Sequence, residues 1–161
     1  MGELISRGTL SDLEVRQVAL GPFDKGDAPS ADFLDLRVAS FVRALQDKGE
    51  LANYAPILAR VLVDVPIHRA YEGSVLGHLI GPVERQGIDF SPSAFMFLER
   101  GRFVEESLSY LQDNIKDLAT FQKLSETTVR PEFEERKQLA LNRIRRRMAN
   151  PTKGRGTNRT K

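Results

Sequence analysis

Apolar residues spaced for helices dominate this chain, and no stretch shows the apolar–polar alternation of a β-strand. The clearest pattern covers about residues 102–124, where apolar residues recur at steps of four and three: Val104, Leu108, Leu111, Ile115 and Leu118. No Asn-Gly or Asp-Gly pair marks a hairpin. With 161 residues, the chain is long enough for one domain with a sizeable core. We therefore expect an all-α protein, a compact bundle of five to seven helices.

Residues that favour helix starts divide the chain. The sequence Ser-Asp-Leu-Glu at residues 11–14 is typical of a capping box and predicts a helix over about residues 12–19. Ser30 is a favourable N-cap for a helix over residues 31–48. Further helix starts are expected at two prolines: Pro92, which precedes a short buried helix ending at Arg100, and Pro131, which opens the last helix, ending at Met148.

The middle of the chain is less regular. Asn53 is expected to cap a helix that carries Pro56 in its first turn, where the missing N–H costs little. Residues 67–81 have helical spacing, but their two interior glycines weaken that pattern. Residues 82–89 are predicted to form a loop or a short turn of helix.

Charge is distributed unevenly along the chain. The net charge is +2, but residues 130–161 carry +8 and residues 1–129 carry −6. The basic stretch holds eleven cations: Arg130, Arg136, Lys137, Arg143, Arg145, Arg146, Arg147, Lys153, Arg155, Arg159 and Lys161. Such asymmetry indicates a polyanionic partner. We expect residues 1–148 to form one helical domain with a frayed start over residues 1–10, and residues 149–161 to form a disordered basic tail.

The basic stretch predicts contact with a nucleic-acid backbone, because arginine and lysine bind phosphate. The residues that we expect to make this contact are Arg136, Lys137, Arg143, Arg145, Arg146, Arg147, Lys153 and Arg155. Phe133 is the one aromatic residue of this stretch, which favours backbone contact over base stacking. Two alternatives stay open: pairing of these cations with the acidic body or with an acidic protein partner, and binding to a membrane surface.

The sequence offers little for catalysis. It has no cysteine, which excludes disulfides, thiolate nucleophiles and thiolate zinc sites. His68 and His78 lack the acidic neighbours of a metal-binding helix face, and we expect both to be structural or surface residues. Neither a nucleophile elbow nor a phosphate-binding loop is present. We expect a protein that is not an enzyme and needs no cofactor or metal.

No apolar run reaches the 18 or so residues of a membrane span, and the first residues do not resemble a signal peptide. Gly2 and Ser6 match the bare pattern for myristoylation, a short motif that often occurs by chance. We expect a cytoplasmic protein without membrane contact.

An order of short motifs gives one family resemblance. Phe41-Val42-Arg43-Ala44-Leu45 resembles an early Phe-x-x-x-Leu helix, and Gly77-His78-Leu79 precedes a loop. A central pair of helices follows with Ser91, Phe95, Leu98, Leu108 and Leu111. Over about residues 40–125, this order resembles the small subunit of CRISPR effector (Cascade-type) complexes. The resemblance implies a catalytically inert helical bundle, present in several copies, that contacts guide RNA or target strand within a ribonucleoprotein. It assigns no individual site residue.

Overall fold

The computed structural model describes residues 10–21 and 30–151, and every regular element in them is helical. The all-α fold is therefore confirmed. The described residues hold eight α-helices, one more than the upper bound expected. In chain order the elements are α2 (Asp12–Leu20), α3 (Ala31–Asp47), α4 (Leu51–Val63), α5 (Arg69–Arg85), α6 (Ser91–Arg100), α7 (Val104–Asn114), α8 (Leu118–Glu126), the 3-10 turn η1 (Pro131–Phe133) and α9 (Glu134–Ala149).

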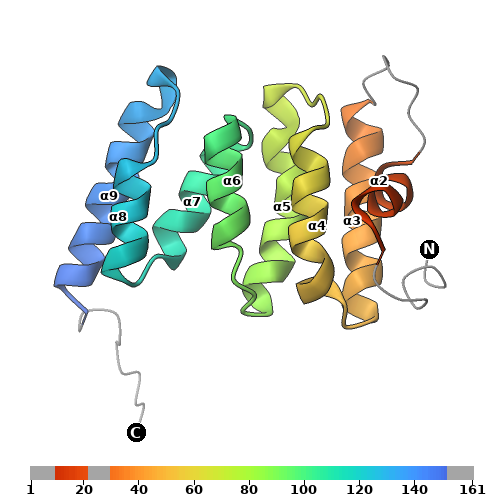
Figure 1. Cartoon of the computed structure of the whole chain (residues 1–161), viewed down its shortest axis with the longest axis horizontal. Coiled ribbons are helices and arrows are strands. Elements are labelled where there is room, and N and C mark those ends of the chain that lie inside the picture. The colour runs from red at the N-terminus through yellow and green to blue at the C-terminus, as the bar shows by residue number, and fades with distance from the viewer. Residues whose placement is uncertain (1–9, 22–29, 152–161) are drawn as a thin grey trace, which may run out of the picture.

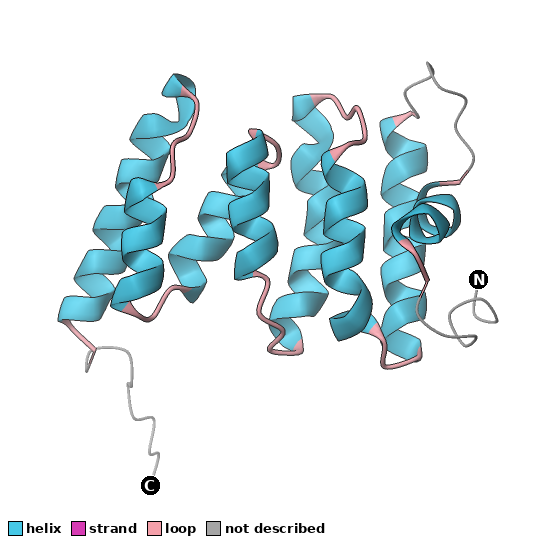
Figure 2. Ribbon diagram, viewed as in Figure 1, coloured by secondary structure: helices cyan, strands magenta, loops and turns pink. Residues whose placement is uncertain are grey.

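The helices stand side by side in a row, so the molecule is elongated where a compact bundle was expected (Figure 1). Helices α3, α5, α7 and α9 form one layer, in which each packs on the next. Helices α2, α4, α6 and α8 lie in front of them as a second layer, with α2 running across the others (Figures 1 and 2). The main packing contacts join each helix to the next one or two helices along the chain.

The core fills the space between the two layers with aliphatic and aromatic side chains. Its largest fully buried members are Phe41, Tyr54, Phe90, Phe97 and Phe103. Two buried tyrosine hydroxyls also accept hydrogen bonds from backbone amides outside the helices. Tyr54 accepts from Leu10 at 3.0 Å, and Tyr110 accepts from Phe90 at 2.9 Å. These bonds tie irregular chain to the core, where an unpaired amide would be costly.

Both side-chain caps predicted for the first two helices are confirmed. The Ser11 hydroxyl accepts from the Glu14 amide at 3.3 Å, and the Glu14 carboxylate accepts from the Ser11 amide at 2.8 Å. The Ser30 hydroxyl accepts from the Phe33 amide at 3.3 Å and starts α3. Local hydrogen bonding of this kind depends on residues three apart, which is why the sequence alone locates it.

One prediction in the middle of the chain is wrong. Helix α4 starts at Leu51, so Asn53 lies inside it and donates to the Glu50 carboxylate, and Pro56 lies beyond the first turn. The prediction for residues 82–89, a loop or a short turn of helix, is confirmed, because α5 continues through Pro82 to Arg85 and irregular chain follows. In both helices the flanking apolar residues are buried against neighbouring helices, and this packing outweighs the local cost of proline.

The helix predicted over residues 102–124 is two helices. The chain is extended at Ile115, and Asp117 starts α8 by accepting from the Thr120 amide at 2.8 Å. Leu118, expected on the apolar face, is 69% exposed as a result. The cap formed by Asp117 and Thr120 is the sequence signal for this break, and the regular apolar spacing concealed it.

A buried ion pair holds the turn between α6 and α7. Arg102 donates from Nε to Glu72 of α5 at 3.0 Å, and from its two Nη atoms to the carbonyls of Val63 and Val65 at 3.0 and 2.8 Å. The other Glu72 oxygen accepts from the amide of Phe103 at 3.0 Å. Phe103 has φ of 48°, the one positive value at a non-glycine residue in the described part of the chain. The ion pair therefore joins α4, α5 and a strained turn.

Replacing Arg102 with Met should lower the free energy of unfolding by about 3 kcal/mol, because Glu72 would stay buried without its counter-charge and two carbonyls would lose their donor. Arg60→Met is the matched control. Arg60 pairs with Asp12 at 2.8 Å, but both side chains are about half exposed, so the expected loss is about 1 kcal/mol at most. Urea denaturation followed by circular dichroism measures both, and equal losses would contradict the role given to Arg102.

Candidate nucleic-acid interface

Helix α9 carries most of the predicted interface, and it packs on α7 and α8. Its apolar line is buried as expected, with Ala140, Leu141 and Ile144 inside and Met148 partly buried. Its first turn holds two glutamates and its last turn holds Arg146 and Arg147, an order that complements the helix dipole. The helix therefore fixes the direction in which each of its basic side chains points.

Lys137 does not belong to an exposed basic face. Its side chain is buried, with 5% of the residue exposed. Its ammonium group donates to the carbonyls of Ser125 and Thr127 at 2.9 and 2.7 Å. These carbonyls lie at the end of α8, where the last turn of a helix leaves acceptors without partners. Lys137 is a structural cap, and its predicted role in phosphate binding is corrected.

Arg136 and Arg147 also serve the fold. Arg147 donates to the carbonyls of Gln112 and Ile115 at 2.6 and 2.5 Å, and these carbonyls lie at the end of α7. Arg136 donates to Ser109 at 3.0 Å and to the Gln112 side chain at 3.2 Å, and its Nε lies 3.4 Å from a carboxylate oxygen of Glu105. Both guanidinium groups thus hold α9 against α7.

Three arginines of α9 are exposed and weakly engaged. Arg143 makes one long hydrogen bond, 3.4 Å, to Gln112. Arg145 donates to Asn142 at 3.1 Å and lies over the ring of Phe121. The Arg146 side chain has no hydrogen-bond or ion-pair partner among the described residues. Arg143 and Arg146 are three residues apart and share one side of the helix, whereas Arg145 projects toward α8.

Lys153 and Arg155, the last two residues of the predicted interface, lie outside the described residues. Among the described residues, the candidate interface therefore consists of Arg143 and Arg146, with Arg147 beside them and partly occupied by the α7 carbonyls. Arg145 contributes from a separate side. Sequence reasoning located the helix and its charge. It could not separate exposed cations from those that cap other helices, because the capped carbonyls come from distant parts of the chain.

Both histidines have structural contacts, as predicted. His68 caps α5 by accepting at Nδ1 from the Ala70 amide at 3.2 Å. His78 Nε2 lies 3.0 Å from a carboxylate oxygen of Asp35, whose other oxygen accepts from the Ser74 hydroxyl at 2.6 Å. Burial of the Asp35 carboxyl opposes its ionisation, but the contacts with Ser74 and His78 outweigh it and hold the pKa of Asp35 below its usual value. No cluster of potential metal ligands occurs among the described residues.

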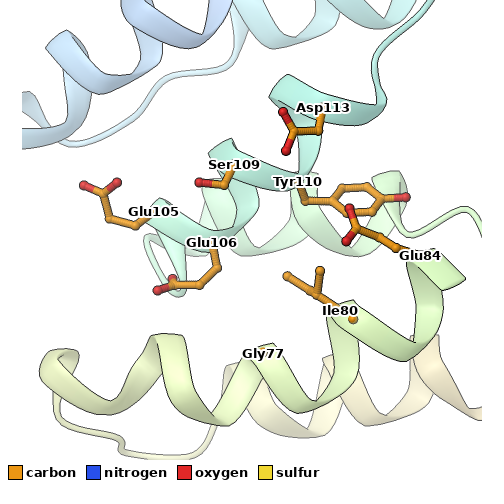
Figure 3. Close-up of a pocket in the computed structure, with 9 residues that line it drawn as sticks. Gly77, Ile80, Glu84, Glu105, Glu106, Ser109, Tyr110 and Asp113 are labelled. Carbon is orange, nitrogen blue, oxygen red and sulfur yellow. The ribbon is translucent and has the colours of Figure 1, made fainter. Parts of the chain in front are cut away.

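A groove that the sequence did not predict lies between α5 and α7 (Figure 3). It has a volume of about 390 Å³ and an apolar floor that includes Ile80 and Tyr110. Four carboxylates line it: Glu84, Glu105, Glu106 and Asp113. Burial raises the pKa of Glu106, and the charges of Glu72 and Glu105 raise it further against the opposing effect of its own backbone amide. Glu84 comes from α5 and the other three acids come from α7, so no local motif marks the groove.

Comparison of the chain with protein-family models, with curated proteins and with solved structures gives no match in any of the three. The resemblance to the CRISPR small subunit therefore stays a prediction. Within residues 10–21 and 30–151, none of the helices combines the length and apolarity that crossing a membrane requires.

Replacing Lys137 with Met should destabilise the fold by about 1–3 kcal/mol, because the carbonyls of Ser125 and Thr127 would lose the donor that closes the end of α8. Arg146→Met, a similar change at an exposed position of the same helix, should leave stability nearly unchanged. Thermal and urea denaturation of the two variants test this assignment. A Lys137 variant of unchanged stability would show that the ammonium group is not needed as a cap.

Proposed function

We propose that this protein is a non-catalytic helical protein that binds a nucleic-acid backbone through the end of α9 and the basic segment that follows it. The observation that carries the proposal is the charge separation, with +8 in residues 130–161 against −6 in the rest. Arg143 and Arg146 support it, since they are exposed, adjacent on one side of α9 and nearly free of internal partners. An acidic body repels a polyanion and thereby directs it to this end.

The chemistry of these side chains predicts the kind of binding. A guanidinium group offers planar, multiple donors that suit phosphate oxygens. Helix α9 contains no aromatic residue on which bases could stack beside Arg143 or Arg146. The Phe121 ring belongs to α8 and lies near Arg145. Binding should therefore depend little on base sequence and strongly on salt, because each neutralised phosphate releases counterions.

Replacing both Arg143 and Arg146 with Ser should weaken binding to a single-stranded oligonucleotide. It should also reduce the slope of log K against log salt by about 0.7 per lost phosphate contact. Arg16→Ser combined with Arg43→Ser is the matched control, because it removes two exposed arginines from the opposite end of the row. Fluorescence anisotropy at several salt concentrations measures both the affinity and the slope.

Deleting residues 152–161 should cost less affinity than removing Arg143 and Arg146, because the helix fixes the geometry of its arginines. Equal affinity of the Arg143/Arg146 variant and the unchanged protein would place the phosphate-binding face elsewhere. Absence of any nucleic-acid binding at low salt would overturn the proposal as a whole.

Membership in a ribonucleoprotein is a more specific form of this proposal. Its CRISPR version depends on the sequence resemblance alone. Purification without nuclease tests membership in a ribonucleoprotein. Co-purified nucleic acid and an early elution volume would support it. A clean monomer counts against it.

One observation favours a second candidate, a helical adaptor that docks onto a protein partner through α9. The outer surface of this helix carries a shallow groove lined by Glu132, Glu135, Arg136, Leu139 and Asn142. Leu139 is 45% exposed there, at the end of the row where a further helix would continue the packing. Leu139→Asp should abolish such docking and leave nucleic-acid affinity nearly intact, so the variant distinguishes the two candidates.

A further inference from the structure

We propose that the groove between α5 and α7 binds this chain's own basic C-terminal segment, residues 152–161. The groove has the shape of a peptide site. Gly77 and Gly81 lie one helical turn apart on its α5 side, and a Cβ atom added at Gly77 would meet nothing within 4 Å. Ile80 and Tyr110 give the groove an apolar surface, on which the aliphatic parts of lysine and arginine can pack (Figure 3).

The groove is lined by carboxylates, and its negative charge favours a basic occupant. No lysine or arginine in the described part of the chain forms a salt bridge with Glu84, Glu106 or Asp113. Glu105 is shared with Arg136, and Arg85 lies beside Gly81. Four carboxylates against two cations leave the groove negative. Residues 152–161 carry Lys153, Arg155, Arg159 and Lys161 and no acid.

The chain leaves α9 next to this groove. Arg147 lies two residues before the end of α9 and donates to the Gln112 carbonyl at 2.6 Å. The next residue, Asp113, lines the near end of the groove, and Glu105 lies eight residues further back along α7. Eight residues of helix span about 12 Å. Ten extended residues reach roughly 30 Å, so the segment is long enough to enter the groove and follow it.

The composition of the segment also fits. It contains Gly154 and Gly156 and no large apolar side chain, so an extended backbone can lie close to the glycine-bearing surface of α5. Its cations are spaced along its length, and the acids of α7 lie near both ends of that helix, with Glu105 and Glu106 at one end and Asp113 at the other. Docking there withholds these cations from other polyanions, so the groove would regulate how much of the basic stretch is available.

The absence of cysteine permits a direct test on the full chain. A single Thr160→Cys change would carry a nitroxide label, and ¹⁵N-resolved spectra would report its distance from groove amides. The amides of Gly77, Gly81 and Ser109 should lose most of their intensity, and reduction of the label should restore it. At 1 M NaCl, where the Debye length is about 3 Å, the loss should disappear.

A groove variant and a matched control sharpen the test. Glu84→Gln, Glu106→Gln and Asp113→Asn together should restore the intensities at low salt. Asp64→Asn, Glu99→Gln and Glu126→Gln remove the same charge from exposed sites outside the groove and should leave the loss unchanged. The spectra themselves show whether each variant is folded.

Three results would overturn the proposal. They are full intensity at the groove amides of the labelled chain, an equal loss in the groove variant, and a loss that appears when ¹⁵N chains without a label are mixed with labelled ¹⁴N chains. The last result would mean that the segment enters the groove of another molecule. No nucleic acid is present in these samples, so this test and the binding test of the proposed function fail or succeed separately.

Discussion

The contact of Glu72 with Arg102 and Phe103 is the interaction on which the middle of the row depends. It places an ion pair at the point where α4 ends, α5 makes its first turn and the chain turns from α6 into α7. A guanidinium group is suited to this position because it can satisfy two carbonyls and a carboxylate at once. The Glu72 carboxylate in turn accepts from the amide of Phe103, a residue in the left-handed conformation at the start of α7.

The same logic recurs in α9, where cations meet helix ends. Lys137 closes α8, and Arg147 closes α7, so each neutralises part of a negative helix terminus. The cations that form one block in the sequence therefore fall into two groups. Some bind the carbonyls at helix ends, and others are exposed and weakly engaged. Under the proposed function, Arg143 and Arg146 contact an external anion, and under the docking proposal the groove acids beside α7 compete with that anion for the cations further along the chain.

Much of the fold follows from local rules. The cap at Ser11, the start at Ser30 and the final helix from Pro131 depend on residues within one turn, and sequence reasoning found all three. The break at Asp117 was missed because regular apolar spacing continued across it, and the start of α4 was placed too late because burial outweighed the local preference of Pro56 for the first turn. The sequence also predicted the last helix, on which the candidate site lies. The burial of Lys137 depends on carbonyls brought together only by the turn between α8 and α9.

The row of helices also bears on how the chain acquires its structure. Because each helix packs mainly on the next two helices along the chain, most of the packing of a given helix is complete once the next pair of helices has been made. The N-terminal helices can therefore pack during synthesis, before α9 leaves the ribosome. Until α9 packs, its cations are free to bind the polyanionic surface of the ribosome.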